Sequence, residues 1–172
     1  PHGVFSSHRH AAACLWLENT PWGAAIRASS WMFPVLLWMH YVGLSVWCVS
    51  TLAVDLRLMG VGPLRQTAVE LSERLRTWKW LGFVVALLGG FLLLSAEATV
   101  YVTNIGFRLK LGVLGPLALA WHLRVQTTCP EWEATESGRA AGAWAGMVEV
   151  LLWLSVVVAA VVFQLTNFIT HQ

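Results

Sequence analysis

Five ionisable residues occur inside long apolar stretches of this chain: His40, Glu97, Lys110, His122 and Glu149. A charge at membrane depth costs at least ~2.5–3.5 kcal/mol on insertion scales, so such residues usually face the protein interior and often have a function. An imidazole in this setting could ligate a haem iron, and nearby carboxyl or ammonium groups could bind propionates or move protons. These residue types therefore indicate redox or proton chemistry within a membrane.

Four apolar stretches, at about 31–54, 80–102, 106–123 and 141–165, must position these residues. Each is close to the ~20 residues that a helix needs to cross a bilayer. Hydrophobic residues make up 57% of the chain and charged residues 12%, against about 25% charged in soluble domains. The sequence predicts an all-α fold, an integral membrane four-helix bundle in the lipid bilayer. A net charge of +2 excludes nucleic acid as a partner.

The chain divides into a flexible, His-containing tail (1–10), an interfacial segment (11–30) and the bundle itself (31–172). Within the interfacial segment, Thr20-Pro21 is typical of a helix start or a break. His8 and His10 in the tail could bind copper or another divalent ion.

A second interfacial helix is predicted between the first two spans. Leu64, Ala68, Leu71 and Leu75 repeat at helical spacing after Pro63, with charged residues between them. This pattern is typical of an amphipathic helix lying on the membrane surface.

Basic residues predict the orientation. The connections after spans one and three carry seven Lys and Arg residues, namely Arg57, Arg65, Arg74, Arg76, Lys79, Arg124 and Arg139. The other side carries four: Arg9, Arg27, Arg108 and Lys110. The positive-inside rule then places both termini outside, in the periplasm if the protein lies in a bacterial inner membrane.

Two further patterns leave alternatives open. Gly142 and Gly146 form a small-xxx-small pair, which permits close helix packing within the chain or between copies in a homo-oligomer. Among the 11 tryptophans, Trp38, Trp47, Trp121 and Trp153 are predicted to lie deeper in their spans, where they could wall a flat cofactor or fill the core.

Helix depth sorts the polar residues into two groups. His40, Glu97 and Lys110 fall in the outer half, where His40 and Glu97 could satisfy each other and Lys110 could instead snorkel outward. Gln164 and Asn167 of the fourth span also fall in this outer half.

The second group gathers at the inner side: Asp55 and Arg57 end span one, His122 and Arg124 end span three, and Glu149 lies just inside span four. His122 could also be a boundary residue bonded to a carbonyl.

His40 and His122 differ in depth by ~15 Å at 1.5 Å rise per residue. They are therefore not expected to ligate one iron. A haem held by His40 with another partner, or two cofactors at two depths, stays open.

Short motifs in order give a family resemblance. The runs from Asn19 to Pro34, His40 to Gly43, Asp55 to Gly60 and Asn104 to Leu111 resemble those of a bacterial four-helix membrane family of unknown function. That family is more distantly similar to the CopD-like copper-resistance membrane proteins and the HemJ-type protoporphyrinogen oxidases.

The resemblance implies that His40 and Lys110 form a tetrapyrrole or metal site. One position departs from the pattern: Leu37 stands where related sequences often carry an acidic residue.

From these observations we predict a haem-b-binding membrane protein linked to electron transfer or quinone redox. The cofactor-binding candidates are His40, Lys110, Glu97 and His122, with His40 as the metal ligand. The alternatives are an accessory subunit of a membrane complex or homo-oligomer, a tetrapyrrole-oxidising enzyme, and a copper-handling protein. No nucleotide-binding glycine loop, HExxH or nucleophile elbow occurs in the sequence.

Overall fold

The computed structural model describes residues 11–62 and 66–170, and these residues form helices joined by short turns, without a strand. Three helices are long and apolar enough to cross a membrane: Met32–Leu58, Ala68–Ala96 and Glu136–Val162. The predicted all-α fold is confirmed for the described residues, and three helices have the length and hydropathy that membrane spans require.

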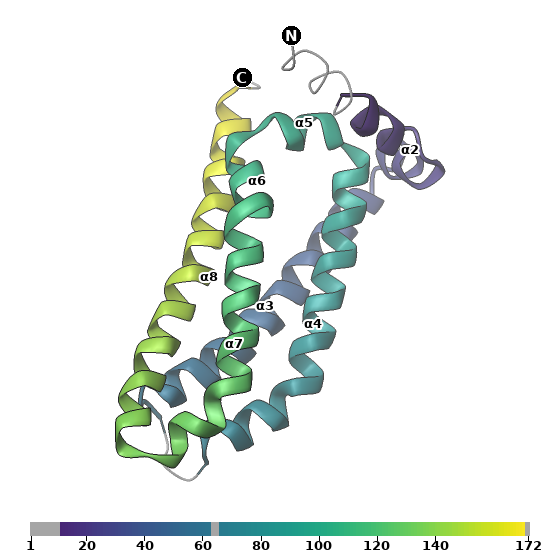
Figure 1. The fold of residues 1–172 in the computed structure, drawn as a ribbon. Helices are drawn as coiled ribbons and strands as arrows, with labels where there is room; N and C mark the ends of the chain where they lie inside the picture. Colours follow the sequence, from purple (N-terminus) through teal and green to yellow (C-terminus); the bar gives the residue numbers. More distant parts are fainter. Residues whose placement is uncertain (1–10, 63–65, 171–172) are drawn as a thin grey trace.

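The chain forms four long helical rods, each running in the opposite direction to the rod before it in the sequence (Figure 1). They are α3 (Met32–Leu58), α4 (Ala68–Ala96), a continuous run made of α6 (Ile105–Leu109), η1 (Lys110–Leu114) and α7 (Gly115–Ala134), and α8 (Glu136–Thr170). Helix 11–18 and the last turns of α8 lie at one end, which we call the terminal end. The connections from α3 to α4 and from α7 to α8 lie at the opposite end, the loop end.

The predicted third span, 106–123, lies in the run α6–η1–α7, which does not meet the length and hydropathy of the other three. Its π-helical turn, in which the Gly115 N–H donates to the Lys110 carbonyl, comes just before Pro116. Proline has no N–H and its ring clashes with the carbonyl four residues earlier in an α-helix. The wider turn relieves this clash, so the run continues through Pro116.

Helix α4 differs from its prediction at both ends. It starts at Ala68, behind a capping box in which Thr67 and Glu70 bond each other's backbone N–H groups, and it ends at Ala96 instead of residue 102. Over its described part, the surface helix predicted after Pro63 is therefore not a separate element, and this prediction is wrong. Its apolar residues continue into α4 and pack on the core of the protein, where they replace lipid contacts with protein contacts.

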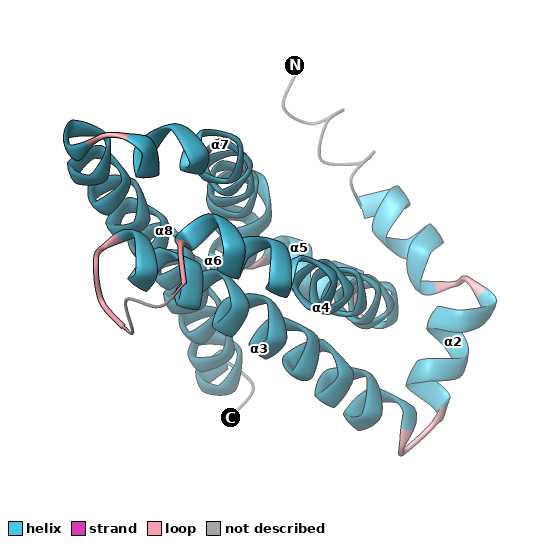
Figure 2. Ribbon diagram, turned by 90° about the horizontal axis from the view of Figure 1, so that it is seen from below, coloured by secondary structure: helices cyan, strands magenta, loops and turns pink. Residues whose placement is uncertain are grey.

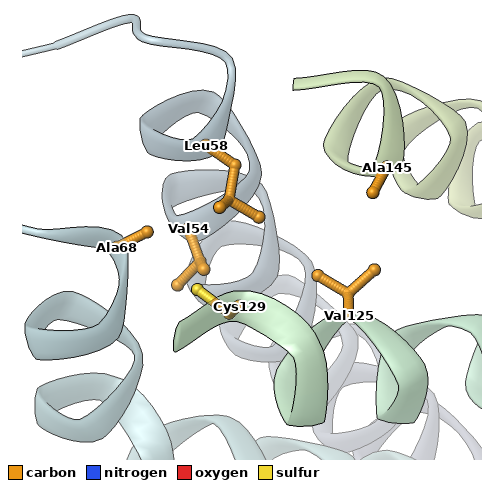
Figure 3. Packing of buried hydrophobic residues seen from close by; sticks show 6 residues of the cluster. All are labelled: Val54, Leu58, Ala68, Val125, Cys129 and Ala145. Carbon is orange, nitrogen blue, oxygen red and sulfur yellow. The ribbon is translucent and has the colours of Figure 1, made fainter. Parts of the chain in front are cut away.

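A small apolar core closes the loop end (Figure 3). It brings together residues of α3, α4, α7 and α8, namely Val54, Leu58, Ala68, Val125, Cys129 and Ala145. The Glu133 carboxylate of α7 accepts hydrogen bonds from the backbone N–H groups of Ala68 (2.6 Å) and Val69 (3.1 Å). Since these N–H groups have no partner inside α4, Glu133 fastens the start of α4 to the end of α7.

Helix α3 crosses the bundle obliquely, from α4 near the terminal end to α8 near the loop end (Figure 1). Glycines permit both contacts. A Cβ at Gly43 would lie 2.6 Å from the backbone nitrogen of Ala86, and one at Gly146 would lie 3.0 Å from the carbonyl oxygen of Asp55. Gly142 likewise faces Trp132 and Leu58 of the same chain. The pair Gly142 and Gly146 thus serves packing within the chain.

The segment 11–30 forms helix 11–18 and α2 (Pro21–Ala28), which lie to one side of the rods (Figure 2). As predicted, Thr20-Pro21 starts a helix: the Thr20 hydroxyl accepts from the Gly23 N–H. Arg27 donates to the Ala96 carbonyl at 2.8 Å, which ties α2 to the end of α4. Helix α5 (Ala98–Thr103) then connects α4 to α6 across the terminal end.

We predict that Gly43→Ala destabilises the protein by about 1–3 kcal/mol, because a methyl group there meets the α4 backbone and must push the helices apart. Gly112→Ala is the matched control, since a Cβ at Gly112 meets nothing within 4 Å. Thermal unfolding in detergent, followed by circular dichroism, measures both. Equal melting temperatures for the two variants would contradict the close contact.

Candidate functional site

Four ionisable side chains from four helices are enclosed near the loop end. Asp55 of α3, Lys79 of α4, His122 of α7 and Glu149 of α8 are 1%, 1%, 3% and 0% exposed. We call these four residues the buried cluster. Burial of charged groups without partners is costly, so their arrangement must provide compensation.

Glu149 is the centre of the buried cluster. Its Oε1 shares a hydrogen bond with Nδ1 of His122, and its carboxyl group also lies within hydrogen-bonding distance of the Asp55 carboxyl. A hydrogen bond between two carboxyl groups requires a proton on one of them, because an ionised carboxylate only accepts. Glu149 therefore lies between an imidazole on one side and a second carboxyl group on the other.

Lys79 supplies positive charge to this site. Its ammonium group interacts electrostatically with the carboxyl groups of Glu149 and Asp55, and it lies 6.0 Å from the ring centroid of Trp80. Within residues 11–62 and 66–170 it forms no ion pair shorter than 4 Å. Lys79 thus compensates the negative charge of the two carboxyl groups without forming a direct ion pair with either of them.

Aromatic rings line the side of the buried cluster that faces the middle of the membrane. Trp47, only 1% exposed, lies 4.8 Å from the His122 ring and 5.5 Å from Trp153, measured between centroids. It also contacts Trp80 and Phe83. These rings keep bulk water and lipid away from the imidazole. They therefore serve core packing.

Several buried polar atoms around the cluster have no hydrogen-bond partner among the residues that the structure describes. They are Oγ1 of Thr51, Oδ2 of Asp55, Nε2 of His122, Oε2 of Glu149 and Nε1 of Trp47 and Trp153. Trp47, Thr51 and Asp55 follow at intervals of four residues on α3, so they share one face. The site therefore offers both donors and acceptors to a proton or a small polar ligand.

The predicted outer-half residues come together only in part: Lys110 lies near enough to His40 for the two groups to interact electrostatically, whereas Glu97 does not join them. His40 is half-buried, and its Nδ1 lies 2.6 Å from the Ala86 carbonyl oxygen of α4. Glu97 is exposed at the junction of α4 and α5, so the predicted pairing with His40 is wrong: α4 ends one residue earlier and turns Glu97 outward. Lys110 is half-buried at the start of η1. The side chains of Gln164 and Asn167 lie outside the described part.

The two histidines lie at different depths, as predicted. His40 contacts α4 at Ala86, Gly89 and Gly90, whereas His122 faces Trp80 of the same helix. Six to ten residues of helix separate these contacts, which is ~9–15 Å. One iron cannot join both imidazoles.

Among the described residues, no group of three His, Cys, Asp or Glu side chains is arranged so that it could hold a metal ion. A metal at His40 would therefore have at most one further ligand from those side chains. The predicted copper ligands His8 and His10 lie outside the described residues.

Sequence reasoning grouped Asp55, His122 and Glu149 correctly but missed Lys79. It counted Lys79 as a loop cation for the orientation, although the residue is buried. The inner count of seven basic residues therefore falls to six, which leaves the predicted direction unchanged. The signal that could have revealed Lys79 is the helical pattern from Ala68 onward, which places it in the third turn of α4.

Comparisons with known proteins give no further assignment: no family model matches the chain, and no curated protein or solved structure is significantly similar to it. The function must therefore be inferred from the geometry and chemistry of the site itself.

We predict that Lys79→Met destabilises the protein by up to about 3–5 kcal/mol, because it leaves the carboxyl pair without its buried counter-charge. Adding Glu149→Gln to this variant should restore part of the loss. Arg76→Met, at a side chain that is 66% exposed, is the control and should cost less than about 0.5 kcal/mol. Denaturant unfolding in detergent measures the three variants, and equal effects at Lys79 and Arg76 would refute a compensating role.

Proposed function

We propose that this protein takes up and transfers protons within a membrane, with Asp55, His122 and Glu149 as the exchanging groups. The observation that carries the proposal is the bonding of Glu149 to both His122 and Asp55 at 0–3% exposure. A proton can move along such a chain because each group can both donate and accept it within hydrogen-bonding distance. Lys79 keeps the site compensated whichever group holds the proton.

The position of the buried cluster favours exchange with the membrane surface at the loop end. Asp55 is three residues from the end of α3, so it lies ~4.5 Å along the helix from that end. On the other side, the indole N–H groups of Trp47 and Trp153 are donors without a partner among the described residues, and the Trp47 ring packs against the His122 ring. Protons would therefore enter from the loop end and wait at the cluster.

We predict a protonated carboxyl signal in the infrared spectrum of the reconstituted protein that titrates with pH and shifts in D₂O. Asp55→Asn and Glu149→Gln should each remove it, because each breaks the shared proton of the carboxyl pair. Glu73→Gln, at an exposed residue of α4, should leave it unchanged. A wild-type spectrum without this signal, or one that Glu149→Gln does not alter, would refute proton uptake at this site.

A second candidate function is haem-b binding at His40, linked to electron transfer or quinone redox. Its support is the 2.6 Å contact between Nδ1 of His40 and the Ala86 carbonyl. Metal-ligating histidines commonly donate their second ring nitrogen to a backbone carbonyl, which fixes the ring and leaves the other nitrogen for the metal. His40 with Nε2 as the ligand fits a haem held by one protein ligand, which would supply one-electron chemistry. The cofactor roles predicted for Lys110, Glu97 and His122 have no comparable support.

We predict a Soret absorption band in protein purified from native membranes, lost in His40→Ala and retained in His122→Gln. The difference is expected because the two imidazoles lie at different levels and His122 is bonded to Glu149. Glu97→Gln, exposed at the start of α5, controls for nonspecific effects. Loss of the band in His122→Gln alone would move the ligand to His122, and absence of a band in native material would remove this function.

We further propose that the protein lies in a bacterial inner membrane, with the loop end inside and both termini in the periplasm. This part of the proposal is supported by the basic residues that border the loop end. The third of the four spans would then be the run α6–η1–α7, which lies between α4 and α8 in the chain and is antiparallel to both (Figure 1).

A further inference from the structure

Thr51 lies on the face of α3 that points into the buried cluster. Trp47, Thr51 and Asp55 follow at intervals of four residues, so they share this face. Trp47 packs against the His122 ring, and Asp55 lies against Glu149. Thr51 is 3% exposed and lies between these two contacts along the helix. Its hydroxyl group is therefore enclosed between the aromatic rings and the two carboxyl groups.

The hydroxyl group of Thr51 does not bond as hydroxyl groups in helices commonly do. A Ser or Thr in a helix can donate to the carbonyl three or four residues earlier, and Ser45, Ser95 and Ser155 of this chain do so at 2.6–2.8 Å. Oγ1 of Thr51 has neither this bond nor any other partner in the described part of the chain. An unsatisfied buried hydroxyl group destabilises a protein, so its place in the interior points to a ligand there.

The polar atoms around this hydroxyl group are of both hydrogen-bonding kinds. Asp55 and Glu149 each have a buried carboxyl oxygen without a partner among the described residues. Trp47 and Trp153 each have a buried indole N–H group without one. A metal ion here would meet the indole N–H groups and the Lys79 ammonium, whereas an anion would meet two carboxyl groups. A small molecule that both donates and accepts satisfies the whole set, and water is the molecule of this kind that protein interiors enclose.

We propose that the buried cluster binds water, which the Thr51 hydroxyl group holds in place beside the imidazole of His122 and the carboxyl groups. A buried water molecule typically makes about three hydrogen bonds to otherwise unsatisfied groups, so the six atoms without a described partner suit about two molecules. The aromatic rings separate this water from lipid and from bulk solvent.

This inference rests on the proposed proton transfer and adds a link to it. Nδ1 of His122 is bonded to Glu149, whereas Nε2 has no partner among the described residues. Without a group at Nε2, the imidazole could only return a proton to Glu149. With water there, a proton can move from Glu149 to Nδ1, from Nε2 to the water and from the water to the Asp55 carboxylate. The imidazole and the water then end with the number of protons that they had before.

The first test is the melting temperature of Thr51→Val in detergent. Valine keeps the branching of threonine at Cβ but cannot bond water. If water is bound, the variant leaves it short of a partner, and the melting temperature should fall by about 2–4 °C. In a dry site the variant removes an unsatisfied hydroxyl group, and the melting temperature should rise. Thr127→Val, at an exposed threonine, is the control and should change it by no more than about 1 °C. An unchanged or raised value for Thr51→Val overturns the proposal.

The second test detects the water directly. Infrared difference spectra of reconstituted protein between two pH values are recorded in ordinary water and in H₂¹⁸O, because the heavier oxygen lowers the O–H stretching frequency of water and leaves the bands of the protein in place. Wild-type protein and Thr51→Ser, which keeps the hydroxyl group, should show a water band that shifts in this way. Thr51→Val should lose it and Thr127→Val should keep it. A band that Thr51→Val does not change overturns the role of Thr51.

The carboxyl signal in the same spectra separates this inference from the proposed function. A carboxyl signal that titrates without a shifting water band overturns bound water and leaves proton uptake intact. If no carboxyl signal titrates, proton uptake is refuted, and the direction in which Thr51→Val moves the melting temperature still decides whether water is bound.

Discussion

The bonding of Glu149 to His122 and to Asp55 is the constraint on which the rest of this structure depends. Removal of an ion from water costs several kcal/mol even after a protein relaxes around it. Glu149 and Asp55 are 0% and 1% exposed, so they must find their compensation inside the bundle. It comes from the imidazole and from Lys79, and a proton shared between the two carboxyl groups would complete it. Four helices must therefore meet at one level, and a shift of any one of them would leave a buried charge uncompensated.

The backbone geometry makes this meeting possible. Helix α3 begins against α4 and ends against α8, so it delivers Asp55 to Glu149 (Figure 1). Gly43 permits the first contact and Gly146 the second, because neither has a Cβ to keep the backbones apart. Glu133 then fixes the start of α4 to α7, in the helix that also carries His122. The polar cluster and the glycine contacts thus support the same arrangement.

Helix rise alone was enough to group Asp55, His122 and Glu149, because depth in a membrane helix follows directly from residue number. The burial of Lys79 was not predicted, because Trp78 and Trp80 beside it resemble a membrane boundary. Hydropathy does not distinguish a lysine at a boundary from a buried one. The prediction that Glu97 is enclosed was wrong for the opposite reason. Glu97 follows an apolar run, but α4 ends just before it. Pairing across helices depends on helix rotation and crossing, which one sequence does not contain.

The two halves of the bundle differ in how they are closed. Near the loop end, apolar and polar contacts between protein groups complete the core. Near the terminal end, α4 and α6 make no contact within the described residues, and His40 is held by α4. Seven residues of α3, ~10 Å, separate His40 from Trp47 beside the buried cluster. A proton needs hydrogen-bonded groups across such a gap, and the aromatic rings there supply few, whereas an electron does not need them. A redox group at His40 and a proton site at Glu149 would therefore communicate through charge across this distance, without a continuous proton path between them.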